Sequence, residues 1–341
     1  MMRLNLINGG GAPGERGMLA SVDQQARRAR REQRRSELRR RRLIALSAIT
    51  AVLAALIAIL ALGSGGRDAG TRSAAPASSH PDGSPAHSAA AGTAATGPAG
   101  PPGRRAVPIL MYHVIAPPPA GAPFPGLYVP PAEFSEQMQA LKSAGWHAVT
   151  PDQVEAYWRR GVPLGAGKPI VLSFDNGYES QYTQALPVLR RLGWVGEENI
   201  QLTGLPPSQG GIGQREIGEL IRAGWELDTQ GFSHADLVTL DAAQLHYQVA
   251  VARSVIQRRF HVPVNWFCYP SGHYDATVIT AVREAGYTGS TTVVPGWAHP
   301  GEDPYRLPRL RVLGGTSGGE LLNLLAAVRT DPPAPAAYTG A

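Results

Sequence analysis

Apolar residues follow two different periods from about residue 107 onward. Short apolar runs bounded by Gly or Pro predict buried strands at 107–112, 169–174, 198–203, 225–230, 264–270 and 290–294. Between them, apolar residues recur at helical spacing and predict helices around 134–141, 178–192, 217–221, 241–260 and 275–285. Strands that alternate with helices indicate an α/β fold with a parallel sheet covered by helices. In such a fold, functional side chains gather at the carboxyl ends of the strands.

One long apolar segment precedes this region. Residues 43–62 contain no charged residue and no Pro, and a helix of that length spans about 30 Å, the thickness of the bilayer core. Arginines crowd the residues before it and few charges follow, so the positive-inside rule predicts a cytoplasmic N-terminus. A cleaved signal peptide is the alternative, but its apolar region is usually shorter, about 7–15 residues. We therefore expect a single-pass protein of the cell membrane with an extracytoplasmic C-terminal domain.

Composition divides the chain into five parts. Stretches rich in Ala, Gly, Ser and Pro cannot bury enough apolar surface to order themselves, so we expect flexible segments before and after the folded part. The predicted parts are a basic cytoplasmic tail (1–42), a transmembrane anchor (43–62), a disordered linker (63–105), a folded domain (106–328) and a flexible tail (329–341).

The charge distribution changes the meaning of the net charge of +6. Residues 1–42 carry 12 Arg against four acidic residues, so the remainder of the chain is slightly acidic. A nucleic-acid partner needs Lys and Arg clustered on a folded face, and we predict none. The single cysteine, Cys268, rules out an intramolecular disulfide and a zinc site built on cysteines.

Polar residues follow several of the predicted strands at the point where each strand ends. Any one of them could be a helix cap or a turn residue, because Asp and Asn are common in both places. Their coincidence on several strands instead predicts a polar pocket at one rim of the sheet. The residues concerned are His113, Asp175, Asn176, Asp228, Gln230, His234, Tyr269, Pro270 and Gly272.

These residues lie in ordered motifs that resemble a known family. The segment 107–312 resembles the polysaccharide deacetylases (the NodB-homology domain, carbohydrate esterase family 4), and most of all their exopolysaccharide-deacetylase-like branch. The resemblance implies a distorted (β/α) barrel of the polysaccharide deacetylase type. The matching pieces are VPILMYHVI at 107–115, LSFDNGY at 172–178, GWELDTQGFSHADL at 224–237, WFCYPSGHYD at 266–275 and AGYTGSTT at 285–292.

The resemblance also implies a chemistry, the hydrolysis of an N-acetyl group on a sugar. In the family a divalent metal, often zinc, is held by one Asp and two His, and a neighbouring Asp is the general base. On this chain the base corresponds to Asp175 and one ligating histidine to His234. The other two ligand positions carry neutral amides, Asn176 in place of Asp and Gln230 in place of His.

Neutral amide oxygens are poor zinc ligands compared with carboxylate and imidazole, so we predict weak metal binding. Asp228 could restore a site with Asp175 and His234, because it shares a strand face with Gln230. Alternatively, the Asp228 carboxylate accepts a hydrogen bond from a nearby backbone amide, and we favour that alternative.

The family's remaining motifs are altered in this chain. The resemblance implies that Tyr269, Pro270, Gly272 and His113 lie near the substrate. The Y-P-x-G form stands where other members carry an Arg that orients the base, and the terminal Leu-x-His motif has no counterpart. The segment 306–312 ends in arginines instead, so the proton donor is unassigned.

Three functions are compatible with these residues. The first is a hydrolase that acts on carbon–nitrogen bonds other than peptide bonds and removes N-acetyl groups from cell-envelope glycans. The second is a metal-poor relative that binds glycan or serves in wall assembly. The third, a structural domain without ligand, is disfavoured by the polar rim.

Overall fold

The computed structural model describes residues 100–205 and 209–340. The strands form one sheet in which neighbours follow the order β7-β6-β5-β4-β3-β1-β8, while β2 pairs with β3 and β9 with β1. All pairings are parallel except that of β8 with β1. The strands are β1 (Val107–Tyr112), β2 (Trp146–Ala148), β3 (Lys168–Asn176), β4 (Glu197–Ile200), β5 (Glu226–Thr229), β6 (Trp266–Cys268), β7 (Gly289–Thr291), β8 (Trp297–Ala298) and β9 (Leu310–Arg311).

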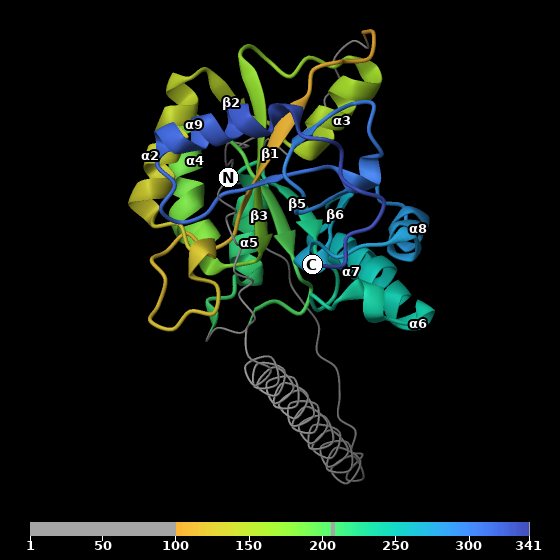
Figure 1. The fold of residues 1–341 in the computed structure, drawn as a ribbon. Coiled ribbons are helices and arrows are strands. Elements are labelled where there is room, and N and C mark those ends of the chain that lie inside the picture. The colour runs from red at the N-terminus through yellow and green to blue at the C-terminus, as the bar shows by residue number, and fades with distance from the viewer. Residues whose placement is uncertain (1–99, 206–208, 341) are drawn as a thin grey trace, which may run out of the picture. The chain divides into compact units, whose positions relative to one another are not determined.

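Helices cover the sheet on both sides. Figure 1 shows the strands in the centre, with α2, α4 and α9 to one side and α6, α7 and α8 to the other. A strand–helix alternation of this kind is the expected basis of a curled parallel sheet. The helices are α2 (Pro131–Ser143), α3 (Pro151–Arg160), α4 (Leu186–Leu192), α5 (Gln214–Arg222), α6 (Ala242–His246), α7 (Ala252–Phe260), α8 (Ala276–Glu284) and α9 (Gly318–Ala327).

The segment 307–311 connects the two sides of the curled sheet. Leu307 forms a parallel bridge with Thr291 at the end of β7, and three residues later β9 pairs with β1 through Leu310 and Leu110. Because its backbone is held on both sides, the side chain between these contacts, Arg309, is fixed inside the sheet, where it is 1% exposed.

The core on the β1–β3 side is aromatic. Phe174 packs against Tyr112 with ring centroids 5.6 Å apart and against Trp225 at 4.9 Å, and the edge of Phe134 from α2 meets Tyr112 at 5.2 Å. Tyr112, Phe134 and Phe174 are fully buried, and burying one large side chain contributes roughly 1.5–3 kcal/mol. This packing fixes β3, whose last residues belong to the candidate site.

The predicted α/β fold with a parallel sheet is confirmed. Each predicted strand and helix has a counterpart, although most strands are shorter than expected; the run 264–270, for example, contributes only β6. Three short strands (β2, β8, β9) and two helices (α3, α9) were not predicted. A strand of two or three residues has too few positions for an alternating apolar and polar pattern to be recognised.

Two segments expected to be flexible are instead attached to the domain. At the end of the predicted linker, Gly100 N donates to Arg160 O at 2.8 Å and Trp158 Nε1 donates to Arg105 O at 2.8 Å. In the predicted tail, Tyr338 forms an antiparallel bridge with Tyr274. Composition does not reveal backbone pairing of this kind between residues far apart in the sequence.

The predicted basic tail, the anchor at 43–62 and residues 63–99 of the linker lie outside the described residues. Among the helices of the described part of the chain, none combines the length and the apolar character needed to cross a bilayer.

Candidate functional site

Asp175 and Arg309 form a buried ion pair at the carboxyl end of β3. Arg309 Nη1 donates to Asp175 Oδ1 at 2.8 Å, and Nη2 donates to Oδ2 at 2.9 Å. Burial alone would raise the pKa of Asp175, but the charge and hydrogen bonds of Arg309 outweigh it and keep this pKa below its usual value. Asp175 is therefore an ionised carboxylate at neutral pH, as a bidentate guanidinium–carboxylate pair requires.

Further donors occupy the same carboxylate. Asn199 Nδ2 donates to Asp175 Oδ1 at 3.2 Å, and the Cys268 thiol contacts Oδ2 at 3.5 Å. Burial raises the pKa of Cys268 to about 12, so the thiol keeps its proton. Arg309 is held in turn by Ser173 Oγ, which accepts from Nη1 at 3.0 Å. Each oxygen of the Asp175 carboxylate thus faces two donors.

Three residues stand where the resemblance implies metal ligands: Asn176 is the last residue of β3, and Gln230 and His234 follow β5. Asn176 has φ +80° and His234 has φ +54°, left-handed conformations that are uncommon outside Gly. Gln230 is 2% exposed, and its Nε2 donates to Cys268 Sγ at 3.1 Å. The oxygens Asn176 Oδ1 and Gln230 Oε1 are buried without a hydrogen-bond partner among the described residues.

Asp228 does not join Asp175 and His234. Its Oδ1 accepts the backbone N–H groups of Asn265 at 2.9 Å and Trp266 at 2.8 Å, at the start of β6. Within the described ranges, no three His, Cys, Asp or Glu side chains are grouped closely enough to share a cation. The shifted metal site is therefore not formed, and the backbone hydrogen bond that we favoured for Asp228 is present.

His113 follows β1 and lies partly buried near the pair. Burial lowers its pKa to about 4, although the charge of Asp175 acts in the opposite direction. The imidazole is therefore neutral at neutral pH, and its Nδ1 is buried without a partner among the described side chains. His113 can accept or donate one hydrogen bond there, depending on its tautomer.

The Tyr-Pro-x-Gly turn lies in the core rather than on an open surface. Tyr269 is 1% exposed, stacks on Tyr274 with centroids 4.9 Å apart, and donates its hydroxyl to Tyr305 O at 2.9 Å. Pro270 and Gly272 are buried as well, and Gly272 has φ +76°. The ring and the hydroxyl of Tyr269 are thus both occupied within the domain.

Two features of the site were missed from the sequence. The first is Arg309, which lies beside Asp175. Its only signal in the sequence was the segment RLPRLRV, in which arginines alternate with apolar residues. Glu197 on β4 is fully buried with neither carboxylate oxygen partnered among the described residues. Burial raises the pKa of Glu197 to about 7, so this carboxyl group exchanges protons near neutral pH.

The divalent metal implied by the resemblance does not fit the side chains described here. The Asp175 carboxylate is neutralised by Arg309, whose positive charge also repels a cation. Of the remaining candidate donors, His234 offers an imidazole, but Asn176 and Gln230 offer only neutral amides, and zinc sites are built from carboxylate, imidazole and thiolate.

Comparison with known proteins agrees with the fold and the motifs. Residues 165–290 match the family Polysaccharide deacetylase. The candidate polysaccharide deacetylase YxkH of Bacillus subtilis is 28% identical over 213 residues, which are 62% of this chain and 73% of YxkH. The poly-beta-1,6-N-acetyl-D-glucosamine N-deacetylase of Escherichia coli is 39% identical over 59 residues, only 9% of its length.

Solved structures share the same fold. The deacetylase PplD of Streptococcus pyogenes superimposes with a TM-score of 0.60 at 24% identity and covers 65% of this chain and 99% of PplD. IcaB of Ammonifex degensii gives a TM-score of 0.55 at 21% identity, over 66% of this chain and 98% of IcaB. Residues 165–290 thus match the Polysaccharide deacetylase family, and the described part of the chain has the fold of these solved deacetylases.

Proposed function

We propose that this protein acts on N-acetyl groups of cell-envelope glycans, as a polysaccharide deacetylase. The observation that carries the proposal is the family match over residues 165–290, a range that contains Asp175 and His234. Hydrolysis would convert the amide and one water into a free amine and acetate. Asp175 is ionised and would take a proton from the attacking water, while the donor of the amine's proton is unassigned.

Acetate release by the purified full chain tests this proposal. The substrates are chitopentaose, β-1,6-linked N-acetylglucosamine oligomers and peptidoglycan fragments, and the control is Asp175→Asn, which keeps the volume but removes the charge. The proposal requires acetate release that is lost in the variant. Equal release by both proteins would contradict it, because a contaminating activity would then be the source.

A second function is favoured by one observation, the crowding of the Asp175 carboxylate by Arg309, Asn199 and Cys268. A carboxylate that accepts from several donors is a weak base, so the domain would bind acetylated glycan without turnover. Binding of chitopentaose in calorimetry together with no acetate release would select this function.

We infer that Asn176 and Gln230, which stand where the family has Asp and His, weaken zinc binding. Metal analysis of the full chain by mass spectrometry should find well under one zinc per chain. The double variant Asn176→Asp/Gln230→His should gain zinc, because it restores an anionic ligand and an imidazole. A full zinc equivalent in the unchanged protein would contradict this inference.

The apolar segment 43–62 supports a further proposal, that the protein is anchored in the cell membrane with residues from 63 onward outside the cytoplasm. Membrane fractionation and protease accessibility of intact cells test it. Recovery of the full chain in the soluble fraction, or protection of the C-terminal domain in intact cells, would contradict it.

A further inference from the structure

A second cavity lies at the opposite end of the strands from Asp175. It is bordered by Arg105, which precedes β1, by Trp146 at the start of β2 and by Lys168 at the start of β3. Asp175 is seven residues further along β3, which is roughly 23 Å at about 3.3 Å per residue. The cavity is therefore separate from the candidate site, and its volume of about 790 Å³ is in the range of ligand sites.

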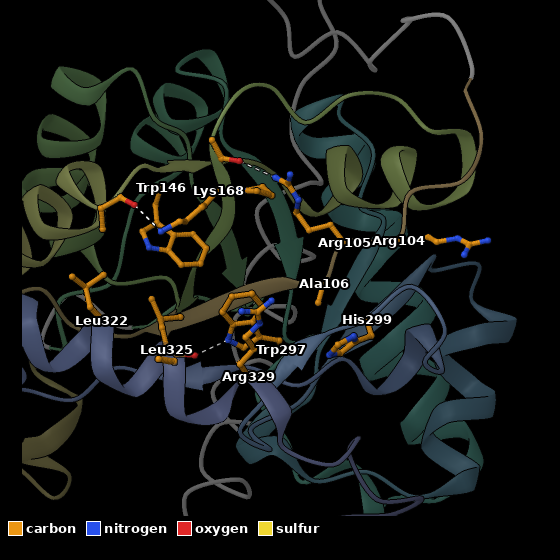
Figure 2. Close-up of a pocket in the computed structure, with 14 residues that line it drawn as sticks. Arg104, Arg105, Ala106, Trp146, Lys168, Trp297, His299, Leu322, Leu325 and Arg329 are labelled. Atoms are coloured by element: carbon orange, nitrogen blue, oxygen red, sulfur yellow. Dashed lines mark hydrogen bonds between the residues drawn. The ribbon is translucent and has the colours of Figure 1, made fainter.

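The charged side chains that line the cavity are all positive. Four cationic side chains line it, Arg104, Arg105, Lys168 and Arg329, and His299 joins them. No Asp or Glu is present among the described residues of its lining. Figure 2 shows these cations around the opening. Such a concentration of like charge is unfavourable without an anion, and clefts lined by one sign of charge attract ligands of the other.

Contacts with the domain position two of these cations. Arg105 Nη1 donates to Gly167 O at 2.8 Å, and Lys168 Nζ donates to Ala144 O at 3.0 Å. Each bond uses one donor of its group, and a guanidinium has five N–H groups in a planar fork. The side chains are thus oriented at the opening with donors remaining for a carboxylate or phosphate.

Two tryptophans form the apolar walls. Trp146 and Trp297 lie with ring centroids 5.7 Å apart at 68°, and Figure 2 shows both among the residues that line the cavity. Trp297 Nε1 donates to Leu325 O at 2.9 Å, which fixes that indole against α9. Lys168 lies 5.5 Å from the Trp146 ring and Arg329 lies 5.3 Å from the Trp297 ring, so cation and aromatic surface are adjacent.

We propose that this cavity binds an anionic saccharide, a chain of sugar rings that carries carboxylate or phosphodiester groups. The indole faces would pack against the C–H faces of the rings, and the arginines and Lys168 would pair with the anions. A concave cavity with indoles at a steep angle suits a ring-shaped ligand better than a flat lipid surface. The inference rests on the proposed action on envelope glycans and adds a second site, which would attach the domain to an anionic polymer near its substrate.

Titration of the full chain with three probes tests the proposal. The probes are oligoglucuronate (carboxylates), poly(glycerol phosphate) (phosphodiesters) and vesicles containing phosphatidylglycerol, each measured at 50 and 300 mM salt. We expect one or both saccharide-type polyanions to bind, with affinity that falls as salt rises. The polymer that binds identifies whether carboxylate or phosphate is the anion.

Paired variants locate the binding. Arg105→Gln/Arg329→Gln removes two exposed cations from the cavity, and Arg190→Gln/Arg191→Gln removes two exposed cations from α4 as a matched control. The cavity variant should lose at least tenfold in affinity while the control keeps it. Acetate release from neutral chitopentaose should be the same in both variants, so this measurement separates the cavity from the deacetylase proposal. Binding to vesicles only, no binding to either polymer, or equal loss in both variants would overturn the proposal.

Discussion

Replacing Arg309 with Leu removes the counter-ion of a carboxylate that has almost no solvent contact. Asp175 and Arg309 are both 1% exposed, and their two hydrogen bonds are 2.8 and 2.9 Å long. Removing one partner of such a pair typically costs about 3–5 kcal/mol, because the other charge stays buried without compensation. We therefore expect the free energy of unfolding to fall by about 3–5 kcal/mol at pH 7.5, measured by urea denaturation with Trp fluorescence.

The pH dependence of this loss carries the sharper test. In the unchanged protein the pKa of Asp175 is lowered from 3.8, so its stabilisation is present above that value and is lost as the pH falls through the folded pKa. In Arg309→Leu, burial raises the pKa of Asp175, and the penalty therefore grows as the pH rises. The loss should be small at pH 4.5 and large at pH 7.5.

Arg311→Leu is the matched control, because Arg311 is exposed and lies only two residues after Arg309, at the end of β9. We expect it to change stability by no more than about 0.5 kcal/mol. Adding Asp175→Asn to Arg309→Leu should recover part of the loss at pH 7.5. The reasoning is refuted if Arg309→Leu costs under about 1 kcal/mol, or costs the same at both pH values.

Three further predictions follow from buried groups and from the C-terminal contacts. Burial raises the pKa of Glu197 to about 7, so its protonated form stabilises the fold, and the free energy of unfolding should decline as the pH rises from 4.5 to 7. Glu197→Gln should flatten this decline, measured by urea denaturation. An unchanged slope would contradict the prediction. Cys268, buried with a pKa of about 12, should react with a thiol reagent only after unfolding, and rapid labelling of the native protein would contradict its burial. Deleting residues 331–341 removes the backbone pairing of Tyr338 with Tyr274, which should lower the thermal midpoint by several degrees in differential scanning fluorimetry; an unchanged midpoint would show that the pairing contributes nothing.

The sequence predicted the parallel strands well because their apolar runs are long and bounded by Gly or Pro. It also predicted that Asp175 and Gln230 would approach each other, and Cys268 now connects them by hydrogen bonds. The helix α3 was missed although it begins with a Thr150–Gln153 capping box, which is a start signal that can be read from the sequence.

Arg309 was missed for a different reason. A partner of Asp175 in the fold need not be near it in the sequence, and these two residues are 134 positions apart. Only the bridging of 307–311 between β7 and β1 brings the guanidinium inside. Local pattern cannot reveal this contact, because it depends on how the two sides of the sheet meet.

The distance along the chain between Asp175 and Arg309 has a consequence for folding. A nascent or truncated chain that ends before residue 309 contains the acidic centre but not its cation. Burying Asp175 in that state is unfavourable, so β3 and its neighbours gain their full stability only when the last strand docks. Contacts of such long sequence separation slow folding, and here they also make it cooperative, since the carboxyl end of β3 and the C-terminal third of the chain become stable together.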